Sequence, residues 1–160
     1  AEFSRAFAER LDASTKFIVK EAENGDLLKS NLVLIAPGGK QMKFVEINGV
    51  AKVEINDDAP VNRFQPSVDY LFNSLADSNC QKNIVAAIFT GMGKDGALGM
   101  KALKQNKNAQ TIAQDEKSSV VFGMPKEAIK LGCVDNIVSL DEAATEIVRA
   151  CGRLPLKNAQ

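Results

Sequence analysis

Residues 83–104 read NIVAAIFTGMGKDGALGMKALK, and this stretch decides the expected fold. Residues 84–89 form an almost continuous apolar run, which is typical of a strand buried on both faces of a parallel sheet. Three glycines follow within residues 90–96, where the chain can turn and approach other backbone closely. Residues 97–103 carry mainly helix-forming side chains. A strand, a glycine loop and a helix in this order predict a site at the carboxyl edge of an α/β sheet.

The residues before this stretch add strands and helices of the same kind. An amphipathic pattern predicts a helix over 3–11, and apolar runs predict strands over 16–20 and 31–36. Alternating residues on both sides of Asn48-Gly49 predict an antiparallel hairpin from Met42 to Ile55. A helix is expected over 67–75.

The residues after it continue the alternation of strands and helices. Strands are expected over 110–113 and 134–140, and a helix over 126–131. Asp141 is the expected N-cap of a final helix. Four residues form the predicted inner face of that helix: Ala144, Ile147, Val148 and Cys151. The chain is therefore predicted to be a three-layer α/β domain, with a mostly parallel sheet, helices on both faces and one antiparallel hairpin.

Composition limits the classes of function. The 160 residues are 45% apolar and 25% charged, as in ordinary globular proteins, and 20 basic residues balance 20 acidic ones. No basic face for nucleic acid, no membrane span and no signal peptide is visible, so a cytoplasmic protein is expected. The three cysteines have no metal-ligand spacing, and no metal or cofactor is expected. Histidine, the commonest general base, is absent.

The glycine loop allows more than one interpretation. Gly91, Gly93 and Gly96 match the dinucleotide fingerprint GxGxxG, and Asp115 follows at about the distance of a ribose-binding acid. Against nucleotide binding, Asp95 would place a negative charge beside the phosphates. Alternatively, Asp95 is the acid of a hydrolase triad, and the amides of residues 91–93 supply an oxyanion-hole donor. In the simplest interpretation Asp95 only caps the helix.

Five segments carry a resemblance to a known family. They are FSRAFAERLD (3–12), NLVLIAPGGKQM (31–42), VNRFQPSVDYLF (61–72), IFTGMGKDGALGMKAL (88–103) and TIAQDEKSSVVFGMPKEAIKLGCVD (111–135). Together they resemble the C-terminal catalytic domain of bacterial chemotaxis protein-glutamate methylesterases, the CheB family. The resemblance implies hydrolysis of glutamyl methyl esters, and deamidation of glutamines, on chemoreceptor helices. It also implies a receiver domain as an N-terminal regulator.

The resemblance assigns roles to residues of this chain. It implies a Ser-His-Asp triad with Asp95 as the acid and the Met92 backbone amide as an oxyanion donor. The family's serine and histidine have no counterpart here, so residues 1–152 are expected to be a catalytic domain truncated at its N-terminus, inactive by itself. Residues 153–160 are expected to be a loose tail. Histidines common in relatives are replaced by Gln41 and Phe64.

Two further expectations concern partners. Arg63 is a candidate for attracting the acidic helices of methylated receptors, although an exposed loop charge without a function would look the same in the sequence. A non-catalytic paralogue that binds receptors, and a nucleotide-binding module, remain alternative hypotheses.

Overall fold

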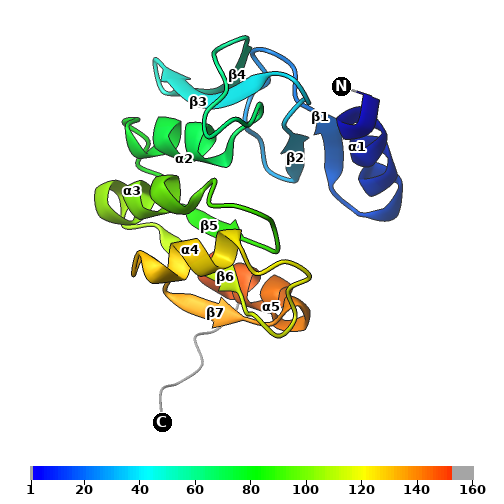
Figure 1. The fold of residues 1–160 in the computed structure, drawn as a ribbon. Helices are drawn as coiled ribbons and strands as arrows, with labels where there is room; N and C mark the ends of the chain where they lie inside the picture. Colours follow the sequence, from blue (N-terminus) through cyan, green and yellow to red (C-terminus); the bar gives the residue numbers. More distant parts are fainter. Residues whose placement is uncertain (1, 153–160) are drawn as a thin grey trace. The chain divides into compact units, whose positions relative to one another are not determined.

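The computed structural model describes residues 2–152 (Figure 1). The chain divides into two compact units, residues 1–80 and 81–160. The tail expected over 153–160 lies outside the described residues. Within residues 2–152, no helix has the length and apolar character needed to cross a membrane.

Unit 1 contains two helices and two pairs of strands. Its elements are α1 (Glu2–Ser14), β1 (Ile18–Glu21), β2 (Leu32–Ile35), β3 (Gln41–Ile47), β4 (Val50–Asn56) and α2 (Val68–Ala76). β1 and β2 pair in parallel, and α1 packs against β1. β3 and β4 form the predicted antiparallel hairpin, which is confirmed. Asn48 and Gly49 have φ values of 52° and 76°, as the tight turn between two strands requires.

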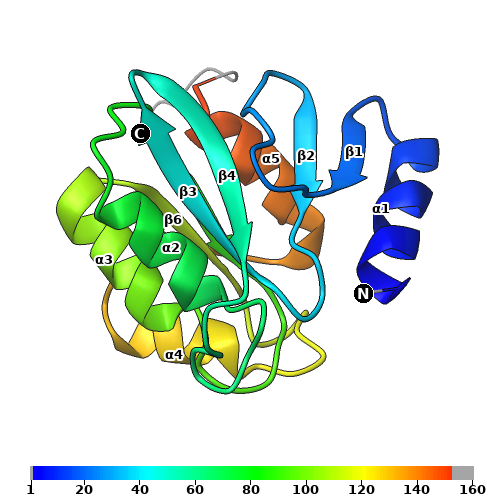
Figure 2. The same cartoon turned by 90° about the horizontal axis from the view of Figure 1, so that it is seen from above.

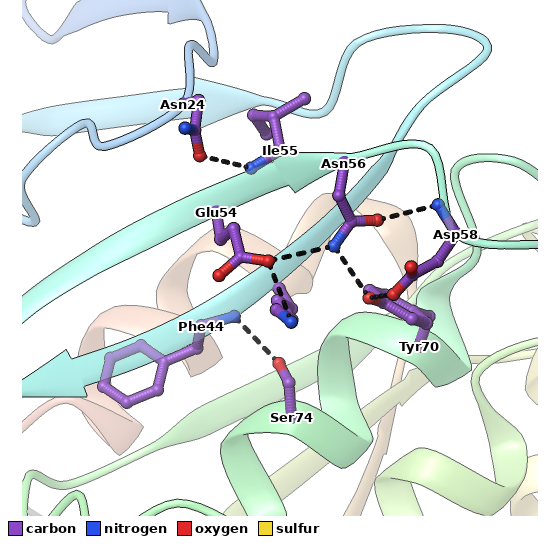
Figure 3. A network of polar contacts seen from close by, with 9 residues as sticks. Asn24, Phe44, Glu54, Ile55, Asn56, Asp58, Tyr70 and Ser74 are labelled. Atoms are coloured by element: carbon purple, nitrogen blue, oxygen red, sulfur yellow. Dashed lines mark hydrogen bonds and ion pairs between the residues drawn. The ribbon is translucent and has the colours of Figure 1, made fainter.

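The hairpin supplies the core of unit 1. Met42, Phe44 and Val53 are buried, and α2 packs against β3. The Phe44 backbone N–H donates to the Ser74 hydroxyl at 2.8 Å, which fastens α2 to the hairpin (Figure 3). Ser67 is the N-cap of α2, and its side chain accepts from the Tyr70 backbone N–H.

Unit 2 contains residues 83–104, the strand, glycine loop and helix from which the fold was predicted. Its elements are β5 (Val85–Ile88), α3 (Ala97–Lys107), β6 (Gln110–Gln114), α4 (Met124–Lys130), β7 (Asn136–Val138) and α5 (Leu140–Ala150). The strands pair in parallel in the order β5-β6-β7. α3 and α4 pack together on one side of this sheet and α5 lies on the other (Figures 1 and 2). Met100, Leu103 and Ile112 are fully buried between these layers.

The predicted class is therefore confirmed: α/β, with mostly parallel pairing and one antiparallel hairpin. Within residues 2–152 the strands pair as three separate sheets, β1-β2, β3-β4 and β5-β6-β7.

The start of α5 differs from the prediction. Its N-cap is Ser139 rather than Asp141, because Ser139 and Glu142 satisfy each other's backbone groups in a capping box. Asp141 lies in the first turn instead. The predicted inner face was also wrong in part: Ala144, Val148 and Cys151 are exposed. The buried residues of α5 are Ala143 and Ala150, with Ile147 half-buried between them on the same stripe.

Asp135 fastens the start of β7 to the rest of unit 2. Its Oδ2 accepts from the Thr111 backbone N–H at 3.0 Å, and Lys104 pairs with Oδ1. Burial alone would raise the pKa of this carboxyl, but the hydrogen bonds from Lys104 and Thr111 outweigh burial and hold the pKa below its usual value.

We therefore expect Asp135→Asn to destabilise the chain more at pH 7 than at pH 3. A carboxyl whose pKa is lowered by folding stabilises the native state above its unfolded pKa of about 4. That contribution is lost as the pH falls through the folded pKa, where protonated Asp135 resembles asparagine. Urea unfolding of wild type and Asp135→Asn at the two pH values measures the gap between their free energies of unfolding. A gap of equal size at pH 3 and pH 7 would contradict this assignment, and the exposed Asp141→Asn is the control.

Candidate active site

Asp95 lies in the loop between β5 and α3, at the carboxyl end of the strand. Asp95 is only 4% exposed, although the nearby Gly93 and Lys94 are exposed. The helix N-cap is Gly96, with φ 92°, so Asp95 precedes the cap by one residue. The predicted location of Asp95 at the strand-loop-helix junction is thus confirmed, and its catalytic role stays a prediction.

Met92 occupies the same loop and has the opposite environment. The residue is 79% exposed. Within residues 2–152 no acceptor is recorded for its backbone N–H. The loop therefore brings a buried carboxylate and an available amide donor together within four residues.

A second loop, residues 115–123, holds the glycine loop in place. Gly91 N–H donates to the Val121 carbonyl at 3.0 Å, and Gly123 N–H donates back to the Gly91 carbonyl at 3.1 Å. The Val121 N–H donates to the Thr90 hydroxyl at 2.8 Å. These reciprocal bonds hold the backbone of residues 90 and 91, directly before Met92, in place. The position of the Met92 amide thus depends on residues about thirty positions later in the chain.

Gln114 is a positioning residue that the sequence analysis missed. It ends β6, is 1% exposed, and its Oε1 accepts from the Thr90 backbone N–H at 2.7 Å. Its Nε2 donates to the Ser118 carbonyl at 2.8 Å. One amide side chain therefore connects both loops. The only sequence signal was a polar residue at the carboxyl end of a predicted strand.

Asp115 has a structural role. Its Oδ1 accepts from the Ser118 hydroxyl at 2.5 Å and from the Ser118 backbone N–H at 2.9 Å. These two bonds lower the pKa of the Asp115 carboxyl. The carboxylate is engaged within its own loop, which argues against the ribose-binding role in the nucleotide hypothesis.

Arg63 belongs to unit 1, whereas Asp95 and Met92 belong to unit 2. Arg63 is exposed on the loop before α2. Of the two positions where the resemblance implies histidine, Gln41 is fully buried and Phe64 is 43% exposed. Within residues 2–152 no group of three or more Cys, Asp or Glu side chains has the geometry of a metal site.

The chain is similar to several known proteins. The family model of the CheB methylesterase matches residues 1–147. A protein-glutamate methylesterase/protein-glutamine glutaminase of Chromobacterium violaceum is 49% identical over 148 residues, which are 92% of this chain and 41% of that protein. The Salmonella typhi protein of this name is 47% identical over 146 residues, 91% of this chain and 41% of that protein.

A solved structure shares the fold. The crystal structure of the Thermotoga maritima CheB methylesterase catalytic domain superimposes with a TM-score of 0.86 at 33% identity, and the match covers 92% of this chain and 77% of that one. The chain spans about two fifths of the length of the curated relatives it matches. Taken together, the family model, the relatives and the shared fold show that this chain belongs to the CheB methylesterase family.

Proposed function

We propose that this chain is part of a protein-glutamate methylesterase and glutamine deamidase that acts on chemoreceptors in bacterial chemotaxis. Residues 1–152 belong to its catalytic domain, and a receiver domain regulates the parent protein. One observation carries the proposal: the same loop holds the buried Asp95 carboxylate and the exposed Met92, whose backbone N–H is available as a donor.

These groups suit two steps of ester hydrolysis. A serine hydroxyl attacks the γ-carbonyl of a methylated glutamate while a histidine takes its proton, and the Met92 N–H stabilises the oxyanion that forms. The imidazolium then returns the proton to the leaving methanol. Asp95 orients the imidazole and stabilises its positive charge. Water releases the glutamate from the serine by the same steps, and a glutamine substrate releases ammonia in place of methanol.

The histidine of this scheme must come from residues outside the chain, and the family resemblance implies that the serine does so as well. The 160 residues contain no histidine, and a lysine would serve as the base only if burial lowered its pKa. Lys94 and Lys117, which lie in the two loops, are both exposed.

We therefore expect the 160-residue polypeptide to release no methanol from a methylated receptor fragment. The same chain extended at its N-terminus by a family segment that carries the serine and the histidine should release methanol. The assay measures labelled methanol under both conditions, with intact mass confirming each polypeptide.

Two outcomes would contradict the proposal. Turnover by the 160 residues alone would require a different base. Absence of turnover in the extended protein, when it is folded and binds receptor, would favour the alternative of a non-catalytic receptor-binding paralogue.

A further inference from the structure

Residues 61–64 form a tight two-residue hairpin turn on unit 1. Val61 N–H donates to the Phe64 carbonyl at 3.1 Å, and Phe64 N–H donates back to the Val61 carbonyl at 2.8 Å. The two central residues both have positive φ, 54° for Asn62 and 71° for Arg63. This is the type I′ geometry, in which glycine is the usual second central residue.

An arginine at this position is unfavourable for folding. A residue with a Cβ is strained in the left-handed region, whereas glycine is not. The Arg63 side chain is exposed, and within residues 2–152 it has no recorded ion pair or hydrogen bond that would offset the strain. Backbone strain that brings no contact inside the molecule points to a contact outside it.

Hydrogen bonds from the buried Gln41 side chain hold the backbone around the turn in place. Gln41 is 0% exposed, and its Nε2 lies 3.2 Å from both the Ala59 and the Phe64 carbonyl oxygens. Its Oε1 accepts from the Ser67 backbone N–H at 2.9 Å. The side chain of one buried residue therefore fastens both ends of the loop.

The chain leading into the turn is fastened to α2 as well. The Asn56 side chain donates to the Tyr70 hydroxyl at 3.0 Å and accepts from the Asp58 backbone N–H at 3.0 Å, while the Tyr70 hydroxyl donates to the Asp58 carboxylate (Figure 3). At the tip, the Asn62 side chain donates to Asp69 Oδ2 at 2.7 Å. The backbone that carries Arg63 therefore loses little freedom when the side chain binds a partner.

We propose that the turn of residues 61–64 is a carboxylate-recognition surface, on which Arg63 binds glutamate side chains of the substrate helix. The choice of ligand rests on the proposed function, because each ester hydrolysis or deamidation leaves a glutamate carboxylate on the substrate. The planar fork of arginine matches a carboxylate with two hydrogen bonds. The neighbouring Phe64 is 43% exposed and offers apolar contact to the same helix.

The test compares binding and stability in the same variants. The probe is a purified chemoreceptor cytoplasmic fragment with either glutamate or glutamine at its modification sites, titrated with the 160-residue chain by calorimetry. Arg63→Gly should weaken binding of the glutamate form roughly tenfold and change binding of the glutamine form little. Because glycine suits the positive φ, the same variant should raise Tm by about 2 °C. Arg63→Lys should lose part of the affinity without that gain in Tm.

Arg63→Gly is expected to lower the affinity for the receptor fragment and to raise Tm. These opposite changes distinguish a role in recognition from a role in stability. The exposed Lys29→Gln is the charge-matched control in unit 1 and should change neither quantity. Equal binding of the glutamate form by wild type and Arg63→Gly, or no binding by wild type, overturns the inference. So does a fall in Tm for Arg63→Gly. The proposed function has its own test: it fails if the extended protein releases no methanol, independently of the binding results for the Arg63 variants.

Discussion

Gly123→Ala is expected to destabilise the chain by about 2–4 kcal/mol and to displace the loop that carries Met92. A Cβ at position 123 would lie 2.6 Å from the Gly91 carbonyl oxygen and 3.0 Å from the Gly93 nitrogen. Both are backbone atoms, so they cannot move aside by a side-chain rotation. The two loops must separate, and the hydrogen bonds from the Gly123 and Met124 N–H groups to Gly91 are lost with them.

Two other glycines of unit 2 provide matched controls. At Gly91 the added Cβ would meet the end of the flexible Met124 side chain, which can rotate away, so Gly91→Ala should cost less. At Gly132 the φ is +65° and nothing lies within 4 Å, so alanine there should cost only about 1 kcal/mol of backbone strain. Urea unfolding of the three variants ranks them by their loss in free energy of unfolding. Equal costs for Gly123→Ala and Gly132→Ala would show that the loops do not depend on this close approach.

The fold was predictable from the sequence wherever the signal is local. The Asn48-Gly49 pair, the apolar run of residues 84–89 and the amphipathic helices each specify their element within a few residues, and the structure confirms them. The start of α5 was misassigned because two local signals compete there. Asp141 is a good capping residue, but Ser139 with Glu142 completes a reciprocal pair and moves the start of the helix to Leu140.

The candidate site was predictable only in part. The loop with Asp95 and Met92 follows from the order of strand, glycines and helix. The support of that loop by Gln114 and Gly123 does not, because both act across more than twenty residues of sequence. The turn at Arg63 was missed for a different reason. Asn-Arg is not a usual hairpin pair, and only the structure shows that both residues adopt positive φ.

Asp95→Asn is expected to reduce methanol release about 10³- to 10⁴-fold in the extended protein that carries the serine and the histidine. Asparagine has nearly the same size as aspartate, so packing around this buried position is retained. It has no negative charge to stabilise an imidazolium, and its NH₂ group favours the wrong histidine tautomer. The loss should fall on kcat, with KM and receptor binding little changed, because in the proposed role the buried Asp95 acts through the histidine and not on the receptor.

A purely structural role for Asp95 leads to a different result. If the carboxylate only stabilised the start of α3, Asp95→Asn would lower Tm while the activity per folded molecule stayed near that of wild type. Asp141→Asn, which removes an exposed carboxylate from the first turn of α5, gives the matched control and should retain full activity. The pH profile adds a second criterion. Without the carboxylate, the pKa of the catalytic histidine should fall, so the residual rate of Asp95→Asn should reach its plateau at lower pH than that of wild type. An unchanged profile together with a lowered Tm would remove Asp95 from the triad and leave it as a helix-stabilising residue.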